Sequence, residues 1–229
     1  MIKPIADISA WQLPENMNYD ALVEGTSGVI LRACYGVSDD IKFHRHYDEI
    51  TKRGGMVGAY HFLLSGQDIS SQAAAIERIL QGKKLPLGVW ADVEITSWSK
   101  LSRNQLESYL IRTREHFGES LGIYTSQYMW DSSIGAPVLG SYKLWVANYQ
   151  VERPNLPRKG LWEDWWLWQF TNKGRIDGVA ANLDLSLFNG TQEQFEEWVR
   201  SEIPSEKVWP LDRITRAIVK LCEIHKLDM

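Results

Sequence analysis

Short apolar runs alternate with amphipathic segments along most of this chain, and this alternation restricts the folds that it can adopt. Segments of helical period cover residues 19–24, 44–53, 70–81 and 102–117. Repeated strand–helix units form parallel sheets, because a parallel pair of strands needs a long crossover connection. Eight runs are predicted to be strands: residues 5–9, 28–34, 56–62, 87–93, 121–124, 142–147, 164–170 and 179–183.

Eight strands predict an α/β fold, an irregular (β/α)-barrel of the TIM-barrel type. Its last third is expected to be strand-rich and short of helices, because the last three strands are joined by polar and aromatic segments. An open doubly wound sheet is the alternative, but no Gly-x-Gly-x-x-Gly or phosphate-cradling loop follows any strand. The predicted barrel covers residues 1–201 and ends with a helix over 192–201.

Residues 202–229 form a predicted C-terminal extension. Pro204 and Pro210 interrupt it, and apolar residues then recur at helical spacing, which predicts one amphipathic helix. That helix either docks on the barrel or supports self-association through residues 210–227. Cys222 in this segment and Cys34 in a strand do not make a disulfide framework, so two reduced thiols are expected.

Composition excludes several function classes. The 229 residues carry a formal net charge of −4, and their basic residues are scattered, unlike those of a nucleic-acid binder. No apolar run is long enough to span a membrane, and the N-terminus lacks a secretory signal. Synthesis in the cytoplasm followed by release without a signal, as through a phage holin, is therefore expected for any role outside the cell.

Asp92 and Glu94 end the apolar run 87–93 and lie two residues apart. Residues i and i+2 of a strand point to the same face, so both carboxylates should project together from a buried strand. Two acids in one site raise at least one pKa, which suits a general acid. A helix N-cap and a divalent-metal site remain the alternatives for an isolated Asp-x-Glu.

Two further acids fall at strand ends, Asp7 after the first strand and Asp184 after the last. Active sites of such barrels lie at the carboxyl ends of the strands, so the four acids should meet at one rim. An acidic floor between aromatic walls suits a glycosidase. The residues expected to bind substrate are Tyr35, Tyr60, Phe62, Tyr124, Trp145, Asn148 and Gln169. A buried packing role is favoured for His61, and a surface position for His44 and His46.

These motifs together resemble glycoside hydrolase family 25, the lysozymes of bacteria and bacteriophages. The resemblance covers residues 1–200, with Ala6 replacing the usual Gly before the first acid. The motifs follow in order: Asp7-Ile8-Ser9-x-Trp11-Gln12, Leu31-Arg32-Ala33-x-Tyr35-Gly36, Val57-Gly58-Ala59-Tyr60-His61-Phe62, Asp92-Val93-Glu94, Gly122-Ile123-Tyr124-Thr125, Leu144-Trp145-Val146-Ala147-x-Tyr149, Leu167-Trp168-Gln169-Phe170 and Asn182-Leu183-Asp184.

The resemblance implies a muramidase of the phage-endolysin or autolysin type that cleaves the β-1,4 bond between N-acetylmuramic acid and N-acetylglucosamine in peptidoglycan. It implies Glu94 as general acid, Asp92 beside the anomeric carbon and the 2-acetamido group, and Asp7 and Asp184 in support, without metal or other cofactor. Either the acetamido oxygen attacks with retention, which we favour, or a carboxylate activates water with inversion. The alternatives are a chitinase-like or endo-N-acetylglucosaminidase barrel, a non-catalytic peptidoglycan-binding barrel and a metal-dependent hydrolase.

Overall fold

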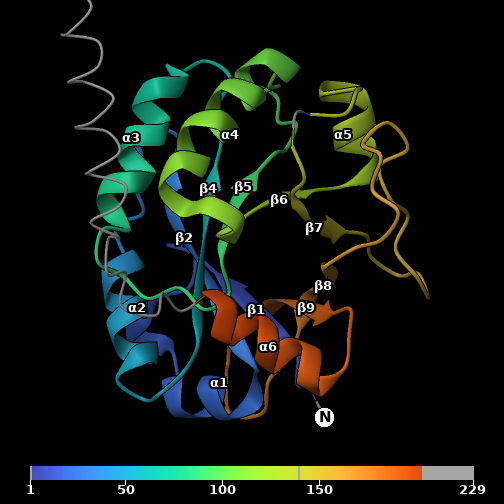
Figure 1. Cartoon of the computed structure of the whole chain (residues 1–229). Helices are drawn as coiled ribbons and strands as arrows, with labels where there is room; N and C mark the ends of the chain where they lie inside the picture. The colour runs from blue at the N-terminus through green and yellow to red at the C-terminus, as the bar shows by residue number, and fades with distance from the viewer. Residues whose placement is uncertain (1, 139, 203–229) are drawn as a thin grey trace, which may run out of the picture.

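Eight strands of one sheet close into a barrel in the computed structural model, which describes residues 2–138 and 140–202 (Figure 1). Around the ring the order is β1-β2-β4-β5-β6-β7-β8-β9, and β9 pairs again with β1, while the short β3 extends β2 outside the ring. The strands are β1 (Ile5–Ile8), β2 (Gly28–Tyr35), β3 (Ser38–Asp39), β4 (Val57–Phe62), β5 (Val89–Asp92), β6 (Leu121–Thr125), β7 (Lys143–Ala147), β8 (Leu167–Gly174) and β9 (Leu183–Phe188). The predicted barrel class is confirmed.

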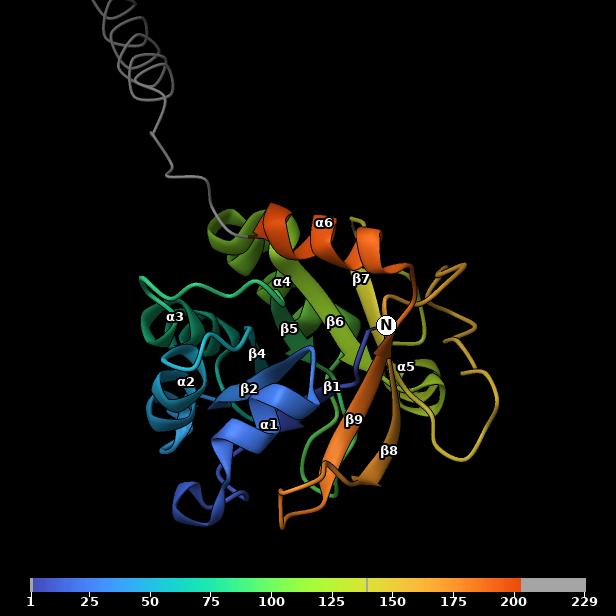
Figure 2. The same cartoon turned by 90° about the horizontal axis from the view of Figure 1, so that it is seen from below.

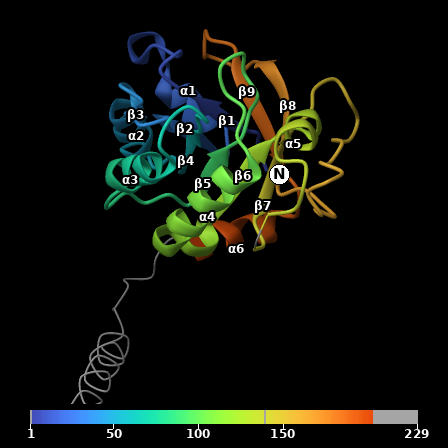
Figure 3. The same ribbon diagram turned by 90° about the horizontal axis from the view of Figure 1, so that it is seen from above.

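Helices cover the outside of the first two-thirds of the barrel, and α2, α3 and α4 lie along one side of it (Figure 3). The connection from β7 to β8 holds no helix within its described residues, as expected for the last third. The helices are α1 (Tyr19–Gly25), α2 (Phe43–Thr51), α3 (Ile69–Ile79), α4 (Arg103–Phe117), α5 (Gln127–Ser133) and α6 (Gln192–Glu202), with 3₁₀ turns at η1 (Pro14–Asn16) and η2 (Gly118–Ser120).

The helix starts follow from side-chain caps. Ser102 and Gln105 form a capping box at the start of α4. The Asp68 carboxylate caps α3 and accepts from the Ser71 N–H. Helix α5 was not predicted, since its seven residues are too few to show a clear helical period.

Strand alternation fills the barrel with aromatic side chains. Trp90 and Trp145 lie fully buried inside, with ring centroids 5.6 Å apart in an edge-to-face arrangement. The Trp90 indole passes directly over Gly122, where an added Cβ would lie 2.4 Å from the ring. A glycine at 122 is therefore required by the close approach of a ring from the neighbouring strand.

The last strand differs from its prediction in both position and direction. Residues 179–183 were expected to form a parallel strand, but β9 covers Leu183–Phe188 and runs antiparallel to β8 and β1. Residues 175–182 are too few for a parallel crossover, and the turn signal Asp177–Gly178 reverses the chain instead. Asp184 consequently lies near the start of β9, but the reversal brings it to the same rim.

Helix α6, coloured orange, packs across the amino-terminal end of the barrel, as the view from below shows (Figure 2). Phe195 and Trp198 join one apolar cluster with Ile5, Leu87 and Phe188 from the strands. This packing closes the end of the barrel opposite the acidic rim. Within residues 2–138 and 140–202, no helix is long and apolar enough to cross a membrane. The predicted helix and self-association segment at 210–227, with Cys222, lie outside the described residues.

Candidate active site

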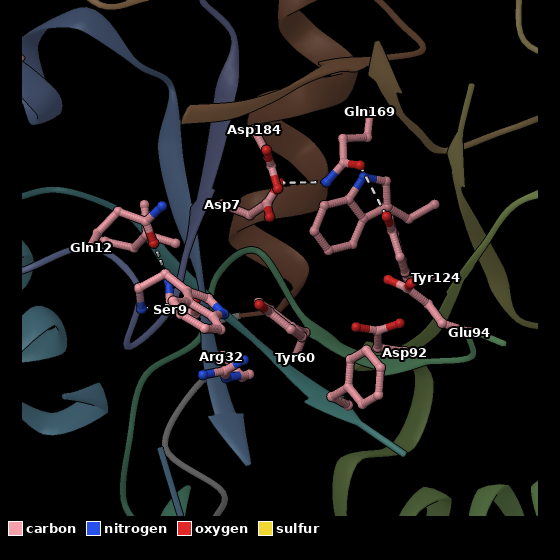
Figure 4. Close-up of a pocket in the computed structure, with 14 residues that line it drawn as sticks. Asp7, Ser9, Gln12, Arg32, Tyr60, Asp92, Glu94, Tyr124, Gln169 and Asp184 are labelled. Atoms are coloured by element: carbon pink, nitrogen blue, oxygen red, sulfur yellow. Dashed lines mark hydrogen bonds between the residues drawn. The ribbon is translucent and has the colours of Figure 1, made fainter. Parts of the chain in front are cut away.

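Four carboxyl groups line one cavity of about 220 Å³ at the carboxyl ends of the parallel strands (Figure 4). Asp7 comes from β1, Asp92 from β5, Glu94 from the residues just after β5, and Asp184 from β9. Asp7 and Asp184 are direct partners in the antiparallel ladder, which brings the two ends of the barrel sequence together. The sequence-predicted acids therefore share one site.

A hydrogen-bonded chain holds Asp7 in place. The Gln169 amide donates from Nε2 to Asp7 Oδ2 at 2.9 Å, while its Oε1 accepts from the hydroxyls of Tyr124 and Tyr149 at 2.9 and 2.5 Å. Because both phenols donate to the oxygen, the amide can present only its NH₂ group to Asp7. The two tyrosines thus fix the orientation of Gln169 and, through it, of the carboxyl group.

Burial and crowding raise the pKa of all four carboxyl groups. Desolvation raises the pKa of Asp7 and of Asp92 well above the usual range, and the neighbouring acids raise both further. For Glu94 burial is the main cause of the raised pKa and the Asp184 charge the second, while desolvation raises the pKa of Asp184. Asp92 Oδ1 is buried without a hydrogen-bond partner among the described residues. The cavity therefore disfavours the state in which all four carboxyl groups are ionised at once.

Among the predicted substrate-binding residues, Tyr60, Phe62, Tyr124, Trp145 and Gln169 line the cavity. Tyr35 and Asn148 are not among the described residues that line it. The Tyr35 ring stacks on Phe62 at 4.9 Å and its hydroxyl accepts from the Trp98 indole at 3.1 Å, while Asn148 Oδ1 accepts from the backbone of Asn155 at 2.8 Å. The position of Asn148 follows from the alternation of side chains along β7. Trp145 and Ala147 share one face of the strand, and Asn148 begins the loop beyond them.

The glycosyl hydrolases family 25 model matches residues 6–179, which include Asp7 and the Asp92/Glu94 pair. The chain belongs to this family. The lysozyme M1 of Streptomyces globisporus is 26% identical over 205 residues, covering 81% of this chain and 67% of that relative. The YegX protein of Escherichia coli K12 is 27% identical over 164 residues, covering 70% of this chain. This chain spans only 58% of the length of YegX.

A solved structure agrees with the family assignment. The muramidase from Trichobolus zukalii superposes with a TM-score of 0.73 at 27% sequence identity, covering 87% of this chain and 99% of that one. The bacterial lysozyme from Streptomyces coelicolor has the same fold, with a TM-score of 0.74 at 22% identity. The irregular barrel is therefore the fold of family 25 glycosyl hydrolases.

The sequence prediction missed four polar or aromatic residues of this family 25 cavity: Ser9, Trp11, Gln12 and Arg32. All four stand inside the quoted motifs, so the motifs were the available signal. Trp11 is 83% exposed at the cavity although its loop is held at both sides. The backbone carbonyls of Ala10 and Gln12 accept from Lys42 Nζ and from His46 Nε2, the latter at 3.2 Å.

Of the three histidines with a predicted position, only His46 differs in the structure. His61 is fully buried on the outer face of β4, where Nε2 donates to the Gly36 carbonyl at 2.7 Å and Nδ1 accepts from the Tyr109 hydroxyl at 2.9 Å. Its predicted packing role is confirmed, and burial lowers its pKa to about 4. The surface position expected for His44 is confirmed. That expected for His46 is wrong, because this residue is 1% exposed and its Nδ1 accepts from the Tyr19 hydroxyl at 2.7 Å. In the described ranges, no cluster of His, Cys, Asp and Glu is arranged to hold a metal ion.

Replacing Asp7 by Asn should stabilise the fold at neutral pH, by on the order of 1 kcal/mol. The folded chain holds a proton on Asp7 at pH values where the unfolded chain has released it, because burial raises the folded pKa. Wild-type stability should therefore fall as pH rises above about 4, the range in which an unfolded Asp ionises. Denaturant unfolding of both proteins between about pH 3 and pH 8 measures the difference.

The difference between Asp7→Asn and wild type should nearly disappear at about pH 3, where the carboxyl is largely protonated in both states. Asp39→Asn is the control, and it should lower rather than raise the stability at neutral pH. The Arg78 hydrogen bond lowers the pKa of Asp39 on the surface, so the ionised carboxylate stabilises the fold. A stability of Asp7→Asn below that of wild type at every pH would contradict the burial argument.

Proposed function

We propose that this chain hydrolyses the β-1,4 bond between N-acetylmuramic acid and N-acetylglucosamine in bacterial peptidoglycan. Family membership supports glycoside hydrolysis, and the relative named lysozyme M1 supports peptidoglycan as the substrate. The observation that carries the proposal is the convergence of Asp7, Asp92, Glu94 and Asp184 in one cavity walled by aromatic side chains. Pyranose rings stack on such walls, and a glycosidase needs carboxyl groups in two roles.

Glu94 is the proposed general acid. It lies half-buried at the rim, and its raised pKa favours the protonated state, so that it can give a proton to the glycosidic oxygen as that bond breaks. In the second half of the reaction the same carboxylate takes a proton from the attacking water. Burial of the carboxyl group thus extends to higher pH the range in which it can donate this proton.

Asp92 is the proposed partner of the substrate's 2-acetamido group. The acetamido oxygen attacks the anomeric carbon, the bond to the leaving sugar breaks, and the charged oxazolinium ring forms. Asp92 stabilises that charge and accepts a hydrogen bond from the acetamido N–H; its Oδ1, without a partner among the described residues, has the acceptor capacity. Water then opens the ring at the anomeric carbon, and the product retains its configuration.

Asp7 and Asp184 are proposed to support these two residues. Hydrogen bonding between the pair raises the pKa of Asp7, whereas it lowers that of Asp184, which is consistent with a proton held on Asp7. Asp184 then carries the negative charge that raises the pKa of Glu94. The hydrogen bond from Gln169 keeps the Asp7 carboxyl group oriented beside Asp184. Tyr60 and Trp145 provide walls of the cavity.

Mass spectrometry of the muropeptides released from purified peptidoglycan tests the proposed bond. Borohydride reduction before analysis should mark N-acetylmuramic acid as the reducing-end sugar of every product. Reduced N-acetylglucosamine ends would instead support the endo-N-acetylglucosaminidase alternative. Release of no glycan fragment, with retained binding to the insoluble wall, would support the non-catalytic alternative.

A further inference from the structure

Arg32 brings a positive charge into an otherwise acidic cavity. Among the described residues that line the cavity, it is the only Lys or Arg, beside four carboxyl groups. It lies on β2 directly opposite Tyr60 in the parallel ladder, and Asp92 comes from the strand beyond. Figure 4 shows Arg32 and Asp92 on either side of Tyr60 at the same edge of the cavity.

The Arg32 guanidinium group is held in one orientation. Its Nε donates to Asp40 Oδ2 at 2.8 Å, and its central carbon lies 5.7 Å from the centroid of the Tyr35 ring. The Arg32 side chain is 15% exposed and the Asp40 side chain fully buried. The two Nη groups have no hydrogen-bond partner within the part of the chain that the structure describes. A planar fork with free donors is suited to a carbonyl or carboxylate oxygen.

Asp40 is itself anchored, so that the pair forms a rigid support. Its carboxylate also accepts from the backbone N–H groups of Ala10 and Lys42, each at 2.9 Å. These contacts tie the loop after β1 to the segment after β3. Arg32 therefore does not swing freely between partners, and its Nη groups remain aimed at one part of the cavity.

We propose that Arg32 binds the carbonyl oxygen of the 3-O-lactyl substituent of N-acetylmuramic acid, and so distinguishes this sugar from N-acetylglucosamine. This inference rests on the proposed function, in which Asp92 contacts the acetamido group at carbon 2 of the sugar. Carbon 3 is the adjacent ring atom, and Arg32 is the donor that lies beside Asp92 beyond Tyr60. N-acetylglucosamine carries only a hydroxyl at carbon 3. The lactyl carbonyl is present whether or not a peptide stem is attached.

Binding to two tetrasaccharides tests this assignment on the Glu94→Gln background, which leaves both ligands intact. One ligand alternates N-acetylglucosamine with N-acetylmuramic acid, and the other is chitotetraose, which lacks the lactyl groups. NMR titration measures both affinities, weak ones included. Arg32→Gln should weaken binding of the muramic ligand about 10- to 100-fold, the range for hydrogen bonds to a charged group. Binding of chitotetraose should change less than about twofold, so that the ratio of affinities falls.

Two further variants separate recognition from folding. Arg32→Lys keeps the charge beside Asp40 but loses the fork, so it should weaken muramic-ligand binding by an intermediate factor. Arg78→Gln removes a neighbouring ion pair, Arg78 with Asp39, which is exposed and outside the cavity; neither affinity should change. Thermal unfolding of each variant reports whether Asp40 tolerates the loss of its partner.

Equal loss of affinity for both ligands in Arg32→Gln would overturn the assignment, because a residue that only positions Asp92 or stabilises the fold acts on both. An unchanged affinity for the muramic ligand would overturn it as well. Failure of the proposed function has a different signature, since the Glu94→Gln background would then still degrade peptidoglycan or the wild type would release the wrong reducing end.

Discussion

Replacing Glu94 by Gln should lower kcat for peptidoglycan hydrolysis by about 10²- to 10⁴-fold, the usual contribution of a positioned general acid. Gln keeps the shape and a hydrogen-bond donor but cannot release a proton to the leaving oxygen. The folded state should tolerate the change, because the substitution removes a group whose burial raises its pKa. Turbidity loss of a wall suspension and release of reducing ends measure the rate, and thermal unfolding measures the fold.

The pH profile gives this prediction a second readout. Wild-type activity should fall at high pH as Glu94 loses its proton, and the raised pKa moves that limb above the range of an ordinary Glu. The residual activity of Glu94→Gln should lack this limb. Glu115→Gln, on the exposed face of α4, is the matched control and should behave as wild type. Undiminished activity of Glu94→Gln would refute the general-acid assignment.

The sequence was sufficient to predict the barrel because its signals are local. Each apolar run and its neighbouring helical period can be seen in one window, and the rule that sites lie at carboxyl ends then brings Asp7 and Asp92 to one rim. The cavity indeed collects these acids. Short elements could not be predicted from such windows. Helix α5 has only seven residues, and the two residues of β3 form a ladder only because β2 lies beside them.

Features that depend on distant partners could not be predicted in this way. The direction of β9 depends on a short connection and a turn, and Asp184 reached the correct rim although the predicted strand was misplaced. His46 is buried because Tyr19 and the Gln12 carbonyl, distant in sequence, supply its hydrogen bonds. Arg32 was missed because a single charge within an apolar strand does not show in the sequence which group it contacts. Its ion pair with Asp40 and its position at the cavity are visible only in the folded structure.

Replacing Asp92 by Asn should lower kcat by about 10²- to 10³-fold, the range for loss of one charge-stabilising group. The carboxylate next to the forming oxazolinium would be lost, while the hydrogen bond to the acetamido N–H can be kept by the Asn oxygen. Stability at neutral pH should not fall, since Asp92 is buried with one oxygen unpaired among the described residues. Reduced activity without reduced stability would therefore distinguish a catalytic role from a structural one.

The anomer formed first decides which reaction Asp92 serves. If the acetamido oxygen attacks, the wild type releases the β-anomer of N-acetylmuramic acid, since two displacements at the anomeric carbon restore its configuration. If a carboxylate activates water for one displacement, the α-anomer appears first. Proton NMR of a rapid digest, recorded before mutarotation, separates the two.

A substrate whose acetamido group is removed sharpens the comparison, because it should resist the substrate-assisted reaction but not a direct attack by water. An initial α product, or undiminished cleavage of that substrate, would contradict the role of Asp92 in stabilising the substrate's own amide. Either result would instead support a role for Asp92 in activating water.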